Sequence, residues 1–139
     1  MVVLYDSRML RVTMAAALVV GAMAMFPSTA AAQPETAPCD YNLSAPHVVR
    51  VGSTDMVAVT MAPAGCDGAT PYMSVACVQL EGSPGPGRCR QNNGPLTAVV
   101  YYSPYQPGAT YVATGRGCAT KGNPPQPFCG TTGPVTATL

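Results

Sequence analysis

The sequence predicts an all-β protein, an antiparallel β-sandwich of about seven strands stapled by three disulfides. Short stretches of alternating or β-branched residues recur along the chain, and clusters of turn residues separate them about every ten residues. No window of ten residues shows the periodicity of an amphipathic helix. Six cysteines, an even number, supply the expected disulfides.

An export signal is expected at residues 1–32. Arg8 and Arg11 form a basic start, Met14–Phe26 is an apolar run, and Ala30–Ala32 offers a small-residue cleavage site. The apolar run is shorter than the roughly 20 residues that a membrane span needs. Cleavage is therefore favoured over an uncleaved anchor, and the exported chain is expected to have no membrane span.

The expected mature chain, Gln33–Leu139, has the length of one domain. Residues 33–44 are expected to form a tail and a first short segment, and residues 45–139 the β-sandwich. The whole chain carries a net charge of +1, which argues against nucleic acid as a partner because nucleic acid selects basic patches. Abundant alanine, proline, glycine and valine with little lysine are typical of high-GC bacterial genomes, above all actinobacterial ones.

The cysteines indicate the compartment. All six follow the expected cleavage site, a pattern typical of disulfides in a protein that is secreted or held in the cell envelope. Sequence alone allows 15 pairings among six cysteines. The predicted strands favour pairing of neighbours in the chain, namely Cys39 with Cys66, Cys77 with Cys89, and Cys118 with Cys129, and the last two pairs also have hairpin spacing. A metal site is disfavoured because the chain has one histidine and no CxxC pair.

The first half of the mature chain predicts three or four strands. A short strand is expected at Cys39–Ala45, and His47–Val51 is either a second strand or its continuation. Thr54–Ala62 alternates with period two, and Tyr72–Leu80 is the next strand, after a turn at Pro63–Gly68. The residues of the alternating strand expected on one face are Val57, Val59 and Met61.

The second half of the mature chain predicts four more strands. A return strand at Arg88–Gln91 follows the proline- and glycine-rich loop Glu81–Gly87. Leu96–Tyr102 is β-branched and aromatic, and Ala109–Thr120 is a long strand loosened by two glycines. After a loop at 121–127, the chain is expected to close with a strand at Pro134–Leu139.

A family resemblance begins with the tract Tyr105-Gln-Pro-Gly-Ala-Thr-Tyr111. It resembles the turn that leads into the sixth strand of fibronectin type III domains, and Pro107, Gly108 and Tyr111 match that pattern. The resemblance implies an immunoglobulin-like (fibronectin III-like) sandwich. It also implies that Tyr111 is the corner tyrosine, whose hydroxyl bonds back to nearby backbone.

Two further tracts extend this resemblance. Asp55–Gly68 is similar to the second strand of the family and the loop after it, and Gly133–Leu139 is similar to the last strand. The chain has no tryptophan, and Met61 stands where the family has its core tryptophan. The chain also resembles the actinomycete apoproteins that carry enediyne antibiotics. Those proteins are likewise exported, disulfide-bonded sandwiches of this size.

The residues give little support to catalysis. His47 is the only histidine, and no nucleophile-elbow motif accompanies it. Cysteines held in disulfides offer no thiolate nucleophile. The acidic residues of the mature chain are scattered rather than paired: Glu35, Asp40, Asp55, Asp67 and Glu81. We therefore expect no enzyme activity and no cofactor.

Candidate binding residues fall in two groups. Tyr102 and Tyr105 belong to a cluster of tyrosines, and alternation sends Tyr101 and Tyr102 to opposite faces. These tyrosines either form a binding face or fill a core that lacks tryptophan. The second group belongs to loops that the implied immunoglobulin-like fold would bring together at one end of the sandwich, where they either bind a partner or are inert: Asp67, Lys121, Asn123 and Phe128.

Two functions follow from these expectations. The first is an exported, non-enzymatic interaction module that binds a protein partner not yet identified. The alternative is a carrier of a small apolar ligand in a cleft of the sandwich, suggested by the small inward residues Ala113, Gly115 and Gly117. A secreted hydrolase is a third and weaker hypothesis.

Overall fold

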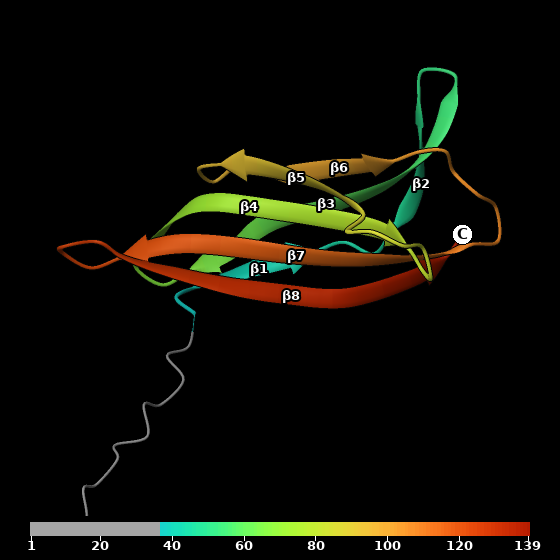
Figure 1. Cartoon of the computed structure of the whole chain (residues 1–139). Coiled ribbons are helices and arrows are strands. Elements are labelled where there is room, and N and C mark those ends of the chain that lie inside the picture. Colours follow the sequence, from blue (N-terminus) through green and yellow to red (C-terminus); the bar gives the residue numbers. More distant parts are fainter. Residues whose placement is uncertain (1–36) are drawn as a thin grey trace, which may run out of the picture. The chain divides into compact units, whose positions relative to one another are not determined.

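The computed structural model describes residues 37–139, which form strands and turns without a helix (Figure 1). The expected export signal, residues 1–32, and residues 33–36 of the expected tail lie outside the described residues. Within residues 37–139, no helix is long and apolar enough to cross a bilayer.

Eight strands, rather than the expected seven or so, form two antiparallel sheets. In the first sheet, β3 is central; β6 pairs with one of its edges, and β1 and β2 pair in succession with the other. The second sheet has the order β5-β4-β7-β8. The strands are β1 (Cys39–Leu43), β2 (His47–Val51), β3 (Thr54–Cys66), β4 (Ala69–Leu80), β5 (Arg88–Asn93), β6 (Ala98–Tyr102), β7 (Thr110–Lys121) and β8 (Gln126–Thr138).

The two sheets pack face to face. β6 lies against β4 and β5, β3 against β4 and β7, and β1 against β7 and β8. The expected alternation of β3 is confirmed, because its inward side chains are fully buried. The buried core cluster consists of Val57, Val59, Met61, Ala76, Val78, Ala98, Val100, Tyr111 and Ala113.

Cys39–Leu43, which the sequence places ahead of the sandwich, is its first strand. β1 pairs with the C-terminal half of β3, from Cys39 opposite Cys66 to Leu43 opposite Met61. The N–H of Ser44 donates to the carbonyl of Thr60 at 2.9 Å. β1 and β2 therefore form one interrupted edge along β3, with the break at Pro46.

β3 continues through residues where the sequence predicts a turn. The turn expected at Pro63–Gly68 is confined to its last two residues, since β3 ends only at Cys66. Pro63 pairs with Tyr41 next to a register shift in β1, and β6 no longer borders β3 beyond Met61. A residue without an N–H fits there because the ladder is already irregular on one side and absent on the other.

β8 also exceeds its predicted length. It begins at Gln126, although a loop is expected through Pro127 and a strand only from Pro134. β8 pairs with β7 alone, so its other edge needs no hydrogen-bond donors. Prolines are tolerated on such an edge strand. The register with β7 shifts between Ala113 and Gly115, next to Pro134.

The three favoured disulfides are confirmed. Cys39–Cys66 joins β1 to β3, Cys77–Cys89 joins β4 to β5, and Cys118–Cys129 joins β7 to β8. All three connect residues that face each other directly in antiparallel ladders. Disulfides of this kind are typical of proteins in an oxidising compartment.

Tyr111 forms the corner contact that the resemblance implies. It is fully buried, and its hydroxyl accepts a hydrogen bond from the N–H of Gln106 at 2.9 Å. Its ring meets the ring of Tyr102 edge-on, with centroids 5.6 Å apart. The turn before β7 is thus tied to the centre of the core.

Candidate functional site

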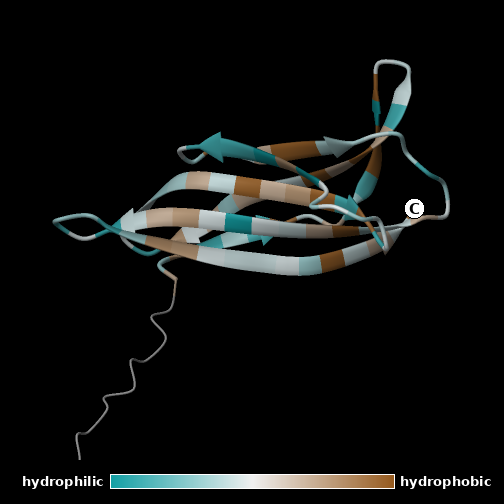
Figure 2. Cartoon of the chain, viewed as in Figure 1, coloured by the Kyte–Doolittle hydropathy of each residue, from teal (hydrophilic) through white to brown (hydrophobic). Residues whose placement is uncertain are grey.

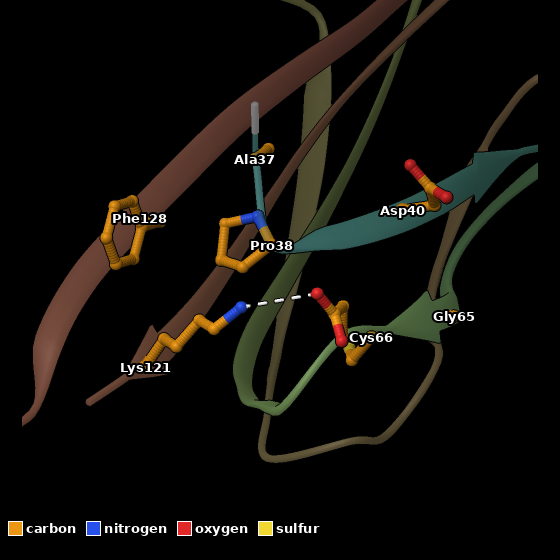
Figure 3. Close-up of a pocket in the computed structure, with 8 residues that line it drawn as sticks. Ala37, Pro38, Asp40, Gly65, Cys66, Lys121 and Phe128 are labelled. Carbon is orange, nitrogen blue, oxygen red and sulfur yellow. Dashed lines mark hydrogen bonds and ion pairs between the residues drawn. The ribbon is translucent and has the colours of Figure 1, made fainter. Parts of the chain in front are cut away.

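Three of the four residues expected at the end loops lie together. Asp67 belongs to the two-residue turn after β3, Lys121 ends β7, and Phe128 lies near the start of β8 (Figure 3). They line an open hollow of about 740 Å³. The expectation that these two loops meet at one end of the sandwich is therefore confirmed.

The charges of the hollow form an exposed pair. The Lys121 ammonium lies 3.4 Å from a carboxylate oxygen of Asp67, and the Asp67 side chain is 98% exposed. An exposed pair of this kind contributes only about 0–1 kcal/mol to stability. Both groups can consequently exchange their present contact for one with a binding partner at little cost.

Two disulfides hold the strands that carry these residues. Cys66 precedes Asp67 and is bonded to Cys39, while Cys129 follows Phe128 and is bonded to Cys118. The N–H of Asp67 also donates to the carbonyl of Pro38 at 2.9 Å. A surface fixed in this way loses little conformational entropy when it binds.

Sequence reasoning missed part of this hollow. Pro38, Asp40 and Gly65 line it together with the predicted residues. These three residues are chain neighbours of Cys39 or Cys66. The expected disulfide between those cysteines was therefore the signal that could have placed Pro38, Asp40 and Gly65 beside Asp67.

The other candidate residues do not join this site. Asn123 lies in the turn between β7 and β8 but does not line the hollow. Tyr102 and Tyr105 are half-buried and pack against the core cluster, whereas Tyr101 is 46% exposed. The expected opposite facing of Tyr101 and Tyr102 is confirmed, and the tyrosines form no continuous exposed face because most of them fill the core.

The inward glycines of β7 do not open a cleft. A Cβ atom on Gly117 would lie 2.3 Å from the nearest atom of the Tyr41 ring, and one on Gly115 would lie 2.6 Å from the Met61 sulfur. The Tyr41 hydroxyl donates to the carbonyl of Cys118 at 2.7 Å. The space that the missing side chains leave is therefore filled by Tyr41 and Met61.

Burial raises the pKa of the Tyr41 hydroxyl, and the nearby Tyr72 raises it further. The hydroxyl is thus held in its neutral form, in which it can donate to the Cys118 carbonyl. This tyrosine acts as a packing residue between β1 and β7.

The remaining titratable groups of residues 37–139 show no metal-binding arrangement, since no three of their His, Cys, Asp or Glu side chains cluster suitably. His47 is exposed, and its Nδ1 lies 3.0 Å from the carbonyl of Ala45. Comparisons of the chain with protein-family models, with curated proteins and with solved structures find no match.

Proposed function

We propose that the protein is an exported, non-enzymatic interaction module that binds a protein partner through the end hollow. The observation that carries this proposal is the convergence of Asp67, Lys121 and Phe128 on disulfide-held strands. Loops on a rigid scaffold are where folds of this kind bind other molecules. The three disulfides support a location outside the cytoplasm, in the envelope or the medium.

We further infer a fibronectin III-like, immunoglobulin-like sandwich. The connections from β3 to β4 and from β6 to β7 cross between the sheets, and β5 borders β4 in the second sheet. Immunoglobulin variable-type domains place an additional strand at that edge. The hydrogen bond of Tyr111 to the backbone five residues upstream also supports this family.

The chemistry of the hollow suggests the kind of surface it would meet. Phe128 is half-buried and presents part of its ring, and one cation and one anion lie beside it. A complementary protein surface would offer an apolar depression for Phe128 and one group of each charge. Aromatic side chains are enriched at such contacts.

The test is capture of a partner from the envelope and medium of the producing bacterium. The wild-type protein and the matched control Val51→Ser, whose changed residue is exposed on β2, should retain the same protein. Phe128→Ser and Lys121→Glu should each reduce its capture about tenfold, because a few central residues dominate binding energy. A partner retained equally by the two hollow variants would contradict the proposal, as would the absence of any captured protein.

The alternative function, a carrier of a small apolar ligand, has less support. This hypothesis depends on unfilled space beside the inward glycines of β7, and the side chains of Tyr41 and Met61 fill that space. Native mass spectrometry of protein from the producing bacterium separates the two functions. A bound small molecule would favour the carrier, and an unliganded mass together with the captured partner would favour the module.

A further inference from the structure

The four free sheet edges of the sandwich differ in their capacity to pair with another strand. On one lateral side, β8 contains Pro127 and Pro134, and the β1–β2 edge is broken at Pro46. On the other side, β5 and β6 contain no proline, and their pairings show no register shift. Proline and bulges prevent an edge from extending its ladder. The β5–β6 side is therefore the side open to an added strand.

β5 has unused backbone groups on its free edge. The N–H of Gly94 donates to the carbonyl of Tyr72 at 2.8 Å, which fixes the alternation of hydrogen-bonded pairs along β4 and β5. Cys89 therefore lies in a non-hydrogen-bonded pair, in agreement with its Cα–Cα distance of 4.0 Å from Cys77. Cys89 and Gln91 consequently direct their N–H and C=O groups away from β4.

No neighbouring strand uses these groups within residues 37–139, because β5 pairs with β4 alone. The open run ends at Asn93, whose N–H is 3.2 Å from the side-chain oxygen of Asn92. β5 is largely hydrophilic, while the neighbouring β6 is hydrophobic (Figure 2). An added strand would thus meet backbone donors and acceptors on one side and apolar surface nearby.

The charges on this side are positive and uncompensated. Among residues 37–139, the two salt bridges engage Arg50 and Lys121, and none engages Arg88, Arg90 or Arg116. Arg88 and Arg90 lie on the exposed edge strand itself. The Arg88 guanidinium lies 5.7 Å from the centre of the Tyr102 ring, which directs it across the gap toward β6.

A groove of about 510 Å³ lies between these two strands, lined by Arg88, Cys89, Arg90, Val99, Val100 and Tyr101. It combines two cations, an exposed aromatic ring and partly buried valine. Arg88 and Arg90 are two positions apart on one strand, so they project to the same face at a spacing of about 7 Å. Acidic residues at alternate positions of an extended peptide have the same spacing.

We propose that an extended acidic peptide segment of a partner protein adds as a strand to the free edge of β5. Its main chain bonds to Cys89 and Gln91, and its alternate carboxylates meet Arg88 and Arg90. Strand addition of this kind draws affinity from main-chain hydrogen bonds and specificity from alternate side chains. This surface is separate from the end hollow, so the inference goes beyond the proposed function and does not rest on it.

A second copy of this chain is a poorer occupant of the same edge. Antiparallel pairing of two β5 strands would bring the arginines of one copy close to those of the other. Like charges placed opposite each other across strands are destabilising. An acidic partner removes that repulsion and supplies the missing counter-charge.

The experiment is selection of random linear peptides on the disulfide-intact protein, followed by affinity measurement with synthetic peptides. We expect enrichment of peptides with acidic residues at alternate positions. The double variant Arg88→Glu with Arg90→Glu should weaken their binding about tenfold or more, since two exposed ion pairs are lost together and the reversed charges repel the peptide. Arg116→Glu, the same change in charge on β7, should leave the affinity within about twofold.

Hydrogen exchange supplies a second measurement. The amides of Cys89 and Gln91 should exchange more slowly when the peptide is bound, while exchange at the end hollow stays unchanged. The proposal is overturned if no alternating acidic pattern is enriched, if the double variant binds as well as the wild type, or if an isomer with its acids in one block binds equally. It is also overturned if sedimentation shows that two copies of the chain pair through this edge.

Discussion

The two lateral sides of the sandwich are closed in different ways. Between β1 and β8, Tyr41 covers Gly117, and Leu43 approaches the glycines beside it in β7 and β8. Between β5 and β6, the exposed Arg88 guanidinium lies over the Tyr102 ring, and the side chain of Asn92 donates a hydrogen bond to the carbonyl of Thr97 at 3.0 Å. One side is packed at van der Waals distance, and the other is spanned by polar groups in contact with water.

This difference predicts how strongly substitutions on each side affect the stability of the fold. Close-packed interiors respond to the addition or loss of a single methyl group, whereas exposed polar contacts contribute little to the free energy of unfolding. Substitutions on the β1–β8 side should therefore affect folding strongly. Substitutions of exposed side chains on the β5–β6 side, the Cys77–Cys89 disulfide excepted, should leave the fold nearly unchanged.

The largest expected effect on stability comes from removing two of the disulfides. Replacing both Cys39 and Cys66 by alanine should lower the free energy of unfolding by about 3.5 kcal/mol, and replacing Cys77 and Cys89 by about 2.8 kcal/mol. The reason is loop length, because the two bonds close sequence separations of 27 and 12 residues. Urea unfolding without reductant measures both, and an equal or reversed order would contradict the comparison.

Gly117→Ala should be the most damaging single substitution of an inward glycine. Its Cβ would overlap the Tyr41 ring, at 2.3 Å from the nearest atom, and overpacking of this kind costs about 1–3 kcal/mol. Gly130 is its register partner on β8 and has open space around it. Gly130→Ala is therefore the matched control and should be neutral or stabilise by up to about 1 kcal/mol. Similar thermal unfolding of the two variants would contradict the tight packing of this side.

Tyr41 makes the packed side sensitive to alkaline pH. Its pKa in the folded protein is raised above the ordinary value of 10.0, mainly by burial. A raised pKa means that the folded protein holds the proton more tightly than the unfolded chain. The associated stability is complete below pH 10 and is lost as pH rises through the folded-state pKa.

Tyr41→Phe should flatten this alkaline decline of stability, and Tyr101→Phe, at an exposed position, should leave it unchanged. The measurement is the urea midpoint as a function of pH from 8 to 11. Because Tyr41→Phe also removes the hydrogen bond to Cys118, its midpoint at pH 8 should already be lower by an amount equivalent to about 1 kcal/mol. An unchanged slope in this variant would exclude Tyr41 as the titrating group.

The smallest effect is expected on the open side. Arg88→Ala removes an exposed cation–π contact with Tyr102 and a long hydrogen bond to the Ser103 carbonyl. Such contacts contribute about 0.5–1 kcal/mol at exposed sites. Thermal unfolding should therefore change little, and a loss comparable to that of Gly117→Ala would show that this side also carries the stability of the fold.

Local patterns were sufficient to predict much of the fold and part of the site. The alternation of β3 depends only on the two-residue period of a strand. The disulfides Cys77–Cys89 and Cys118–Cys129 follow from cysteines placed on either side of a hairpin turn. Asp67, Lys121 and Phe128 could be placed at one end because an immunoglobulin-like sandwich, which the family resemblance implies, brings their two loops together. Tyr111 could be assigned to the corner because the residues around it are contiguous in sequence.

Contacts between distant strands decided the rest. β3 and β8 can each continue through a proline because the ladder beside it is irregular on one edge and has no neighbouring strand on the other, a condition that the proline itself does not encode. Gly115 and Gly117 suggest an opening until Met61 and Tyr41, far away in sequence, are seen to fill it. The free edge of β5 likewise exists only because the β-sandwich leaves it without a neighbour.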